Sequence, residues 1–254
     1  MGGSRKDRRE QERLESKALR RALPLIKDNP VRAAVRTRYA VSLAGGSAPE
    51  AVLAGAQREA DAFGAKIFAG SGAPACAPGC SHCCEHVNVG VNAVEARALA
   101  SHLRQLPPAA LEAVRQRISA NATRAREASP GTYPRMPCAL LGEDRRCTVY
   151  EHRPFVCRRA HSFDAEKCRR AAAGETLDLM VDARVIAAYS QIATAFREAS
   201  AGFGGDAGSY ELHQALDILL GHPTGDLSPA REQTDGRRIR AVEEALNAAL
   251  RPKG

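Results

Sequence analysis

Residues 76–84 read CAPGCSHCC and place four cysteines within nine residues, with the spacing C-x3-C-x2-C-C. Gaps of two or three residues let thiolates converge on one centre from a tight turn, as structural zinc sites and iron–sulfur loops require. Pro78 and Gly79 are typical residues of such a turn. Cys83 and Cys84 are adjacent and cannot easily point at the same ion without strain. The motif is therefore compatible with two nearby metal centres, with one polynuclear cluster, or with one spare thiol.

A second group of four cysteines lies between residues 138 and 168, with gaps of eight, nine and ten residues. The rest of the chain contains no cysteine outside these two windows. Structural cysteines would be scattered among the helices as small apolar residues, so their confinement to two Pro- and Gly-rich windows favours ligands. The predicted metal ligands are Cys76, Cys80, Cys83, Cys84, Cys138, Cys147, Cys157 and Cys168.

Charged and imidazole side chains accompany the cysteines. Cationic neighbours lower thiol pKa values and offset the charge of thiolate–metal centres, whereas the alternative is that they simply face water. The arginines nearest in sequence to the second window are Arg145, Arg146, Arg153, Arg158, Arg159, Arg169 and Arg170. Histidines in or beside the windows are alternative ligands, or partners that hydrogen-bond to ligands, and these are His82, His86, His152 and His161.

The composition predicts a helical fold. The chain has 254 residues, of which 44% are hydrophobic and only 4% aromatic, with no Trp. A chain of this length buries a sizeable core without disulfides, and alanine-rich packing favours helices. We therefore expect a mostly α protein: a single helical domain with an irregular, metal-organised cysteine-rich region that has room for short strands.

Periodicity and capping signals place the expected elements. Asn92 and Glu95 have the spacing of a capping box, as do Ser47 and Glu50. Pro154 is well placed to start a short helical turn that carries Cys157. Residues 129–161 should be irregular, with short strands near residues 147–150. Helices are expected over residues 30–43, from 47 to the first cysteines, from 92 to 106, 108–128, 180–200, 210–220 and 236–250.

These elements define three regions. Residues 1–30 are expected to be a basic, partly disordered N-terminal extension. Residues 31–222 are expected to form the metal-binding domain, with its motif core at 76–168. Residues 223–254 are expected to be a linker and a C-terminal helix.

The N-terminal extension is strongly basic. Residues 1–40 hold twelve Lys or Arg against five Asp or Glu, in a chain whose formal net charge is +8. Such an arm attracts nucleic acid or an acidic partner. The alternative is a solvated helix that aids solubility. The second interpretation is favoured, because no aromatic residue precedes Tyr39 to stack on a base.

The sequence also predicts a compartment. The N-terminus is too charged for a signal peptide, and no run of about 18 uncharged apolar residues occurs, so no membrane association is expected. We expect a cytoplasmic protein. Cysteines in that compartment are normally thiols, which points to metal or redox chemistry rather than to structural disulfides.

Several of these pieces together resemble a known family. They are CAPGCSHCC at 76–84, VNAVEARALASHL at 91–103, CALLGEDRRCTVYEHRPFVCR at 138–158, and the later Cys168. They resemble the CxxCxxCC cysteine-cluster proteins, the zinc- or iron-chelating domain of the YkgJ type. The first gap here is three residues rather than two, which makes the role of Cys76 the least secure. The resemblance implies a metal-chelating domain that uses all eight cysteines, and it implies little about activity.

One branch of that family provides an alternative function. It resembles flagellin lysine N-methylases, which are thought to use an iron–sulfur cluster and S-adenosylmethionine. That branch tends to be longer than this chain, and nothing outside the cysteine region identifies a methyl-donor or lysine pocket. The spacing of Cys76, Cys80 and Cys83 also equals the loop of radical S-adenosylmethionine enzymes, but those enzymes place it on a βα barrel. Whether the protein is an enzyme stays open at this point.

The favoured hypothesis is a metal protein in which the metal connects the two cysteine windows and closes the core. For its identity we expect an iron–sulfur cluster in preference to zinc. Structural zinc is commonly held by two closely spaced cysteine pairs, and only the first window has such spacing. An iron–sulfur cluster accepts ligands from distant segments, as Cys76, Cys80, Cys83 and one later cysteine would provide.

Overall fold

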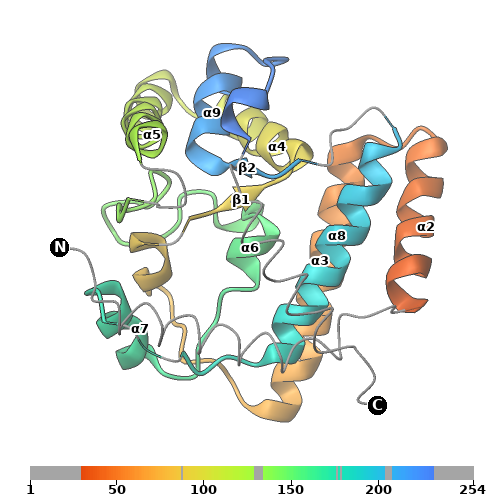
Figure 1. The fold of residues 1–254 in the computed structure, drawn as a ribbon, viewed down its shortest axis with the longest axis horizontal. Helices are drawn as coiled ribbons and strands as arrows, with labels where there is room; N and C mark the ends of the chain where they lie inside the picture. Colours follow the sequence, from red (N-terminus) through yellow and green to blue (C-terminus); the bar gives the residue numbers. More distant parts are fainter. Residues whose placement is uncertain are drawn as a thin grey trace, which may run out of the picture.

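The computed structural model describes residues 30–86, 88–128, 134–175, 177, 179–203 and 208–231. Their order along the chain can be followed in Figure 1. The α-helices are α2 (Pro30–Ala44), α3 (Pro49–Ser71), α4 (Ala93–Leu103), α5 (Pro108–Glu127), α6 (Phe155–Arg158), α7 (Ala165–Ala172), α8 (Ala183–Ala201) and α9 (Leu212–Gly221). The other elements are the 3-10 helices η2 (His82–Glu85), η3 (Tyr150–His152) and η4 (Ser228–Ala230) and the strands β1 (Gly90–Val91) and β2 (Tyr210–Glu211). The expectation of a mostly α fold is confirmed.

Helices α2, α3 and α8 lie side by side as a bundle (Figure 1). Val35 and Tyr39, four residues apart on α2, are both buried in its core. On α3, a Cβ added at Gly64 would come within 3.1 Å of the ring of Tyr189, so glycine lets α3 and α8 approach closely here. Phe155 of α6 reaches into the same core, which links the bundle to the cysteine-bearing region.

A second core forms where α9 packs against α4 and α5. Its fully buried side chains include Leu99 and Leu103 of α4, Ile118 of α5, and Leu216 and Leu219 of α9. The three- and four-residue spacing of these leucines gives each helix one apolar face. The cysteine loops lie against this core, because Cys138, Cys147 and Cys157 pack on its edge.

A two-stranded antiparallel sheet connects distant parts of the chain. Gly90 pairs with Glu211 and Val91 pairs with Tyr210. The sequence predicts a helix from Tyr210, but Tyr210 and Glu211 form β2, and α9 starts two residues later than predicted, at Leu212. Their backbone groups are bonded to β1, and this tertiary pairing overrides the local helical pattern. The sheet holds the start of α9 beside the segment between η2 and α4.

The predicted helix starts have mixed outcomes. The capping box at Asn92 is confirmed: its side chain accepts a hydrogen bond of 3.0 Å from the backbone N–H of Glu95, and the Glu95 carboxylate accepts one of 3.1 Å from the backbone N–H of Asn92. The cap predicted at Ser47 is wrong. Helix α3 begins at Pro49, and its N-cap is Ala48, which makes no side-chain cap bond. Proline has a fixed φ and no N–H, so it sets this helix start by itself.

Two elements of the structure differ from the sequence prediction. The strand expected near residues 147–150 is reduced to an isolated bridge between Leu141 and Cys147, followed by η3. Helix α7 was not expected. The basic extension up to residue 29 and the helix expected at 236–250 lie outside the described residues.

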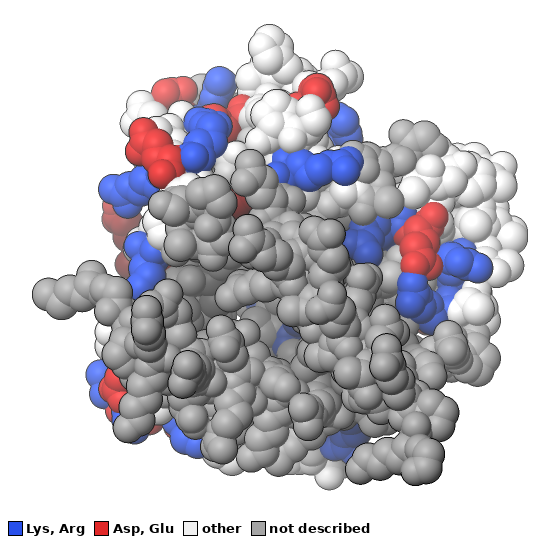
Figure 2. Space-filling model, viewed as in Figure 1, with Lys and Arg blue, Asp and Glu red and all other residues white. Residues whose placement is uncertain are grey.

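The described surface mixes charges of both signs. Figure 2 shows Lys and Arg beside Asp and Glu on the face in view. Arg32 pairs with Glu198, and Arg126 pairs with Asp217 at 3.3 Å. Such exposed pairs are each worth about 0–1 kcal/mol. None of the described helices combines the length and apolar character needed to cross a membrane.

Candidate metal centre

All eight cysteines belong to the described residues, and all are free thiols. Cys76 and Cys80 lie in the loop after α3, and Cys83 and Cys84 lie on η2. Cys138 and Cys147 lie in the irregular segment before η3, Cys157 lies on α6 and Cys168 on α7. Figure 1 shows α6 near the centre of the molecule and α7 at the lower left, both away from α2.

The loop between Cys76 and Cys80 folds back through a tight turn. The backbone N–H of Cys80 donates a 2.9 Å hydrogen bond to the carbonyl of Ala77, and Gly79 has φ 88°. Pro at the second position and Gly at the third are the residues that a type II turn requires. The turn predicted at Pro78 and Gly79 is therefore present, and it brings Cys76 back towards η2.

Helix η2 is fixed from both ends. The backbone N–H of Cys84 donates to the carbonyl of Ser81 at 2.7 Å, which closes the 3-10 turn. Ser81 is fully buried, and its hydroxyl donates to Glu85 at 2.9 Å. Glu85 also accepts a hydrogen bond from Arg145 of the second window. An ion pair thus joins the two cysteine windows at the surface.

The second window folds as a short hairpin. Leu141 and Cys147 form an antiparallel bridge, and the N–H of Thr148 donates to the carbonyl of Leu140 at 2.9 Å. This arrangement places Cys138 and Cys147 on opposite arms of one hairpin. The N–H of Cys138 donates at 2.7 Å to the carbonyl of Cys84, so the hairpin is bonded directly to η2.

Two helices carry the remaining cysteines. Pro154 is the N-cap of α6, which confirms the expected short helical turn with Cys157. The N–H of Phe155 donates at 2.8 Å to the buried carboxylate of Glu95, which anchors α6 to the start of α4. Asp164 caps α7 by accepting from the N–H of Lys167 at 2.9 Å.

Helix α7 packs against η2, so Cys168 comes close to the first window. Burial raises the pKa of the Cys76 thiol, and negative charge on Cys80, Cys83 or Cys168 raises it further. The thiol of Cys168 is therefore within electrostatic reach of the loop that begins with Cys76. A hydrogen bond of 2.8 Å from the N–H of Ala75 to the carbonyl of Ser162 holds the two backbones together.

A second set of thiols lies near Cys157 of α6. Burial raises the pKa of Cys157, and charge on Cys138 or Cys147 raises it further. Burial also raises the pKa of Cys147, and negative charge on Cys138 raises it further. Thiols held this close to one another disfavour ionisation unless a cation balances them.

Cys83 and Cys84 interact with each other. The Cys84 thiol donates a hydrogen bond to Cys83, which lowers the pKa of Cys83 and raises that of Cys84. Arg153 also contributes to the low pKa of Cys83 through its positive charge. Its guanidinium lies 3.6 Å from the centroid of the Tyr150 ring, which holds it beside the thiols.

The other arginines of the second window mostly serve the fold. Arg158 binds Asp61 of α3 at 2.6 Å, and its side chain is 8% exposed. Arg159 donates to Ser190 of α8 at 2.8 Å. Arg169 and Arg170 form exposed ion pairs with Glu166 and Glu175. The prediction that arginines lie beside the thiols and offset their charge thus applies chiefly to Arg153.

The four histidines named from the sequence have other contacts. His86 is bonded to the carbonyl of His82, and His82 lies 4.0 Å from Glu85. The ring of His152 stacks on the ring of His102. His161 is bonded to the carbonyl of Arg159 and to the N–H of Asp182. Asp182 N–H approaches His161 Nε2 at 2.8 Å, which leaves that ring engaged at both nitrogens. These contacts favour a structural role.

Sequence reasoning missed His213, at the start of α9. Its Nδ1 lies 2.9 Å from Glu211, and its Nε2 lies 3.2 Å from the backbone nitrogen of Ala139. Burial opposes a charge on His213, but hydrogen bonds to Cys138 and Glu211 outweigh it and raise its pKa to about 9. The only sequence signal is a Glu-Leu-His step before an apolar helix. The β1–β2 pairing is what brings it to the thiols.

Among the described residues, no three Cys, His, Asp or Glu side chains stand in an arrangement that would hold a metal ion directly. The backbone nevertheless brings both windows together, and the donors are of the type that zinc and iron–sulfur clusters use. A cysteine thiol changes direction by rotation about χ1 between three staggered positions. Metal binding by these residues therefore requires side-chain rotation on the existing backbone.

The arrangement is that of a mostly helical protein with a thiol-rich loop region. Residues 75–175 match the model of the CxxCxxCC family, described as a "Putative zinc- or iron-chelating domain". The matched stretch contains all eight cysteines, and it confirms the resemblance seen in the sequence for this part of the chain. No curated protein and no solved structure matches the chain.

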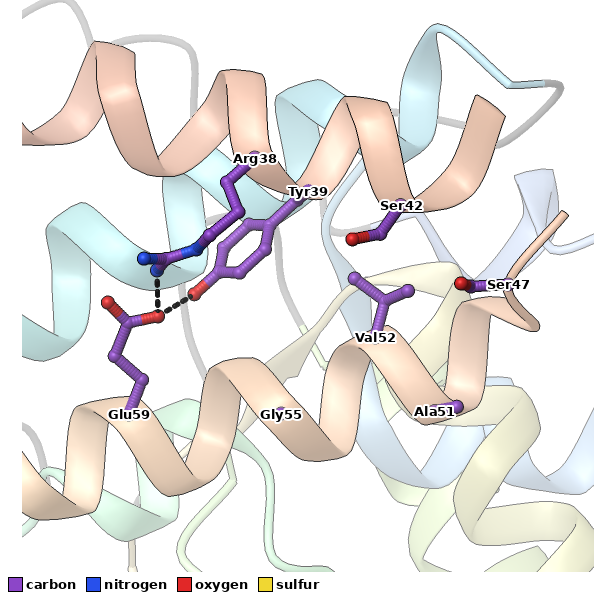
Figure 3. Close-up of a pocket in the computed structure, with 8 residues that line it drawn as sticks. All are labelled: Arg38, Tyr39, Ser42, Ser47, Ala51, Val52, Gly55 and Glu59. Carbon is purple, nitrogen blue, oxygen red and sulfur yellow. Dashed lines mark hydrogen bonds and ion pairs between the residues drawn. The ribbon is translucent and has the colours of Figure 1, made fainter. Parts of the chain in front are cut away.

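A separate cavity lies between α2 and the N-terminal half of α3 (Figure 3). Its volume is about 340 Å3, and at one end Glu59 accepts hydrogen bonds from Arg38 and, at 2.7 Å, from the hydroxyl of Tyr39. Cys76 follows the opposite, C-terminal end of α3. The cavity therefore belongs to the helical bundle and not to the thiol region.

Proposed function

We propose that this chain binds zinc or iron through the thiolates of its eight cysteines, with an iron–sulfur cluster as the preferred form. The observation that carries the proposal is the 2.7 Å hydrogen bond from the N–H of Cys138 to the carbonyl of Cys84, which joins the two windows. Thiolate ligands suit both structural zinc and iron–sulfur clusters. The similarity of residues 75–175 to a zinc- or iron-chelating domain supports the same function.

The preference for iron–sulfur rests on how the ligands are distributed. The first loop offers Cys76, Cys80 and Cys83, and α7 brings Cys168 beside them from a distant part of the chain. Three ligands in one loop and a fourth from elsewhere is a common arrangement around iron–sulfur clusters. Zinc remains the other metal of the proposal, since four thiolates also make a complete structural zinc site.

In this proposal the metal is structural. The thiols bind it, Arg153 offsets part of their negative charge, and the second window is tied to η2. A bound metal supplies binding free energy that is also folding free energy. Eight free thiols also support a reducing compartment, so we propose a cytoplasmic protein.

The identity of the metal is tested on protein purified without oxygen and without a His-tag. We expect a brown preparation with broad thiolate-to-iron absorption, and iron with a matching amount of acid-labile sulfide. A colourless preparation that contains zinc and no sulfide would decide for zinc and would also remove the methylase alternative. Absence of both metals in protein that is folded would refute the proposed function.

His213 provides a further test, because its ring is hydrogen-bonded to Cys138 and is itself oriented by a hydrogen bond to Glu211. We expect His213→Leu to weaken metal retention about 10–100-fold in competition with a chelator, as loss of a residue that orients a ligand typically does. His213→Gln keeps a side chain that can hydrogen-bond and should recover part of this loss. The control is His222→Leu, an exposed residue just after α9. Equal retention by His213→Leu and the control would contradict this positioning role.

A further inference from the structure

The adjacent cysteines of η2 indicate how the eight thiols are divided. Cys83 and Cys84 occupy the middle of a 3-10 helix, which has three residues per turn. Successive side chains on such a helix therefore point about 120° apart. The two Cβ atoms therefore leave η2 in different directions. Rotation about χ1, which breaks the hydrogen bond between the two thiols, lets each thiol reach a different side of η2.

On one side, η2 lies beside the loop that precedes it in the chain and beside α7, which packs against it. The turn at Gly79 brings Cys76 and Cys80 back to η2, and the packing of α7 on η2 brings Cys168 to the same place. The N–H of Ala75 is bonded to the carbonyl of Ser162, so the chain before Cys76 runs beside the chain before α7. The backbone thus brings the segments that carry these three cysteines to the same side of η2.

The hairpin of the second window also contacts η2, and Cys157 of α6 lies within electrostatic reach of the hairpin thiols. Cys138 is bonded through its N–H to the carbonyl of Cys84, and the bridge at Cys147 closes the hairpin. Cys138, Cys147 and Cys157 each pack against the same core. The segments that carry these three cysteines thus lie close to one another, whereas Cys168, the fourth cysteine of its window, lies beside the first window.

We propose that Cys76, Cys80 and Cys168 belong to one metal centre and Cys138, Cys147 and Cys157 to a second, and that Cys83 and Cys84 contribute one thiol to each. This inference rests on the proposed function. Each centre therefore takes ligands from both sequence windows, and neither window forms a centre of its own. Each centre then has four thiolates, the number that a structural zinc site or a [4Fe–4S] cluster takes.

The metal content of serine variants tests the division. Cys80→Ser, Cys168→Ser and Cys147→Ser should each lose about half of the metal of the parent protein. The double variant Cys80→Ser/Cys168→Ser should also lose only half, because both replacements affect one centre. The double variant Cys80→Ser/Cys147→Ser should lose nearly all of it. Cys83→Ser and Cys84→Ser should each lose half, and their combination nearly all.

A second measurement uses the parent protein, so it does not depend on whether a variant folds. Metal is removed stepwise with a limiting chelator, and exposed thiols are alkylated and located by mass spectrometry. Cys76, Cys80 and Cys168 should lose protection together, and Cys138, Cys147 and Cys157 together at a different step. Loss of protection by all eight at once would show a single centre and overturn the division. Grouping of Cys168 with Cys138 would overturn it too, while metal-free parent protein would overturn the proposed function itself.

Discussion

Cys80→Ser and Cys147→Ser are each expected to lower the free energy of unfolding by several kcal/mol. Cys80 follows the turn of the first window, and Cys147 closes the hairpin of the second. If both bind metal, each replacement removes a ligand, and the metal-binding free energy that is lost is folding free energy. The measurement is anaerobic denaturant unfolding with metal analysis of the same samples.

The same variants in metal-depleted protein distinguish a ligand from a packing residue. Serine is close to cysteine in size, so without metal the replacements should change stability by much less than with metal. The control is Ser47→Ala, an exposed position before α3. If both cysteine variants melt within about 1–2 °C of the parent and keep full metal, the structural role of the metal is wrong.

The helices that the sequence predicted well have signals that do not depend on the rest of the fold. Asn92 and Glu95 supply both halves of a capping box, and prolines mark the starts of α2 and α5. The apolar spacing of α8 is equally local, with Val185, Tyr189 and Ile192 all buried. Such elements need no knowledge of their neighbours.

Helix α7 illustrates what local signals miss. Its sequence is AEKCRRAA, and none of its residues is buried, so the helix has no apolar face from which it could be predicted. It is fixed by the cap at Asp164 and by its packing against η2. The same holds for His213, whose place beside Cys138 depends on the pairing of β1 with β2. Contacts between segments so far apart in the chain are not encoded in any short window.

The thiol region could be predicted from the sequence only in part. The two windows, the turn at Gly79 and the short helix with Cys157 follow from spacing and residue type. The crossing of Cys168 to the first window does not, because it depends on how α7 packs. The sequence predicts that one later cysteine joins Cys76, Cys80 and Cys83, but spacing does not say which of the four it is.

Glu95→Ala is the second replacement for which we expect a large effect. The carboxylate of Glu95 is 5% exposed and accepts hydrogen bonds from the N–H of Phe155 at 2.8 Å and from the N–H of Asn92 at 3.1 Å. Its removal leaves two buried N–H groups without this acceptor, at about 1–3 kcal/mol each. We expect a loss of about 2–4 kcal/mol in denaturant unfolding.

The loss should also reach the metal centre, because Glu95 holds the first residue of the helix that carries Cys157. Glu95→Gln keeps one acceptor oxygen, so both its stability and its metal retention against a chelator should fall between those of the parent and Glu95→Ala. Glu112→Ala is the matched control, since Glu112 is exposed near the start of α5 and should change stability by no more than about 0.5 kcal/mol. If Glu95→Ala is as stable as this control, Glu95 does not anchor α6. If it is less stable but retains metal as firmly as the parent, the position of Cys157 does not depend on that anchor.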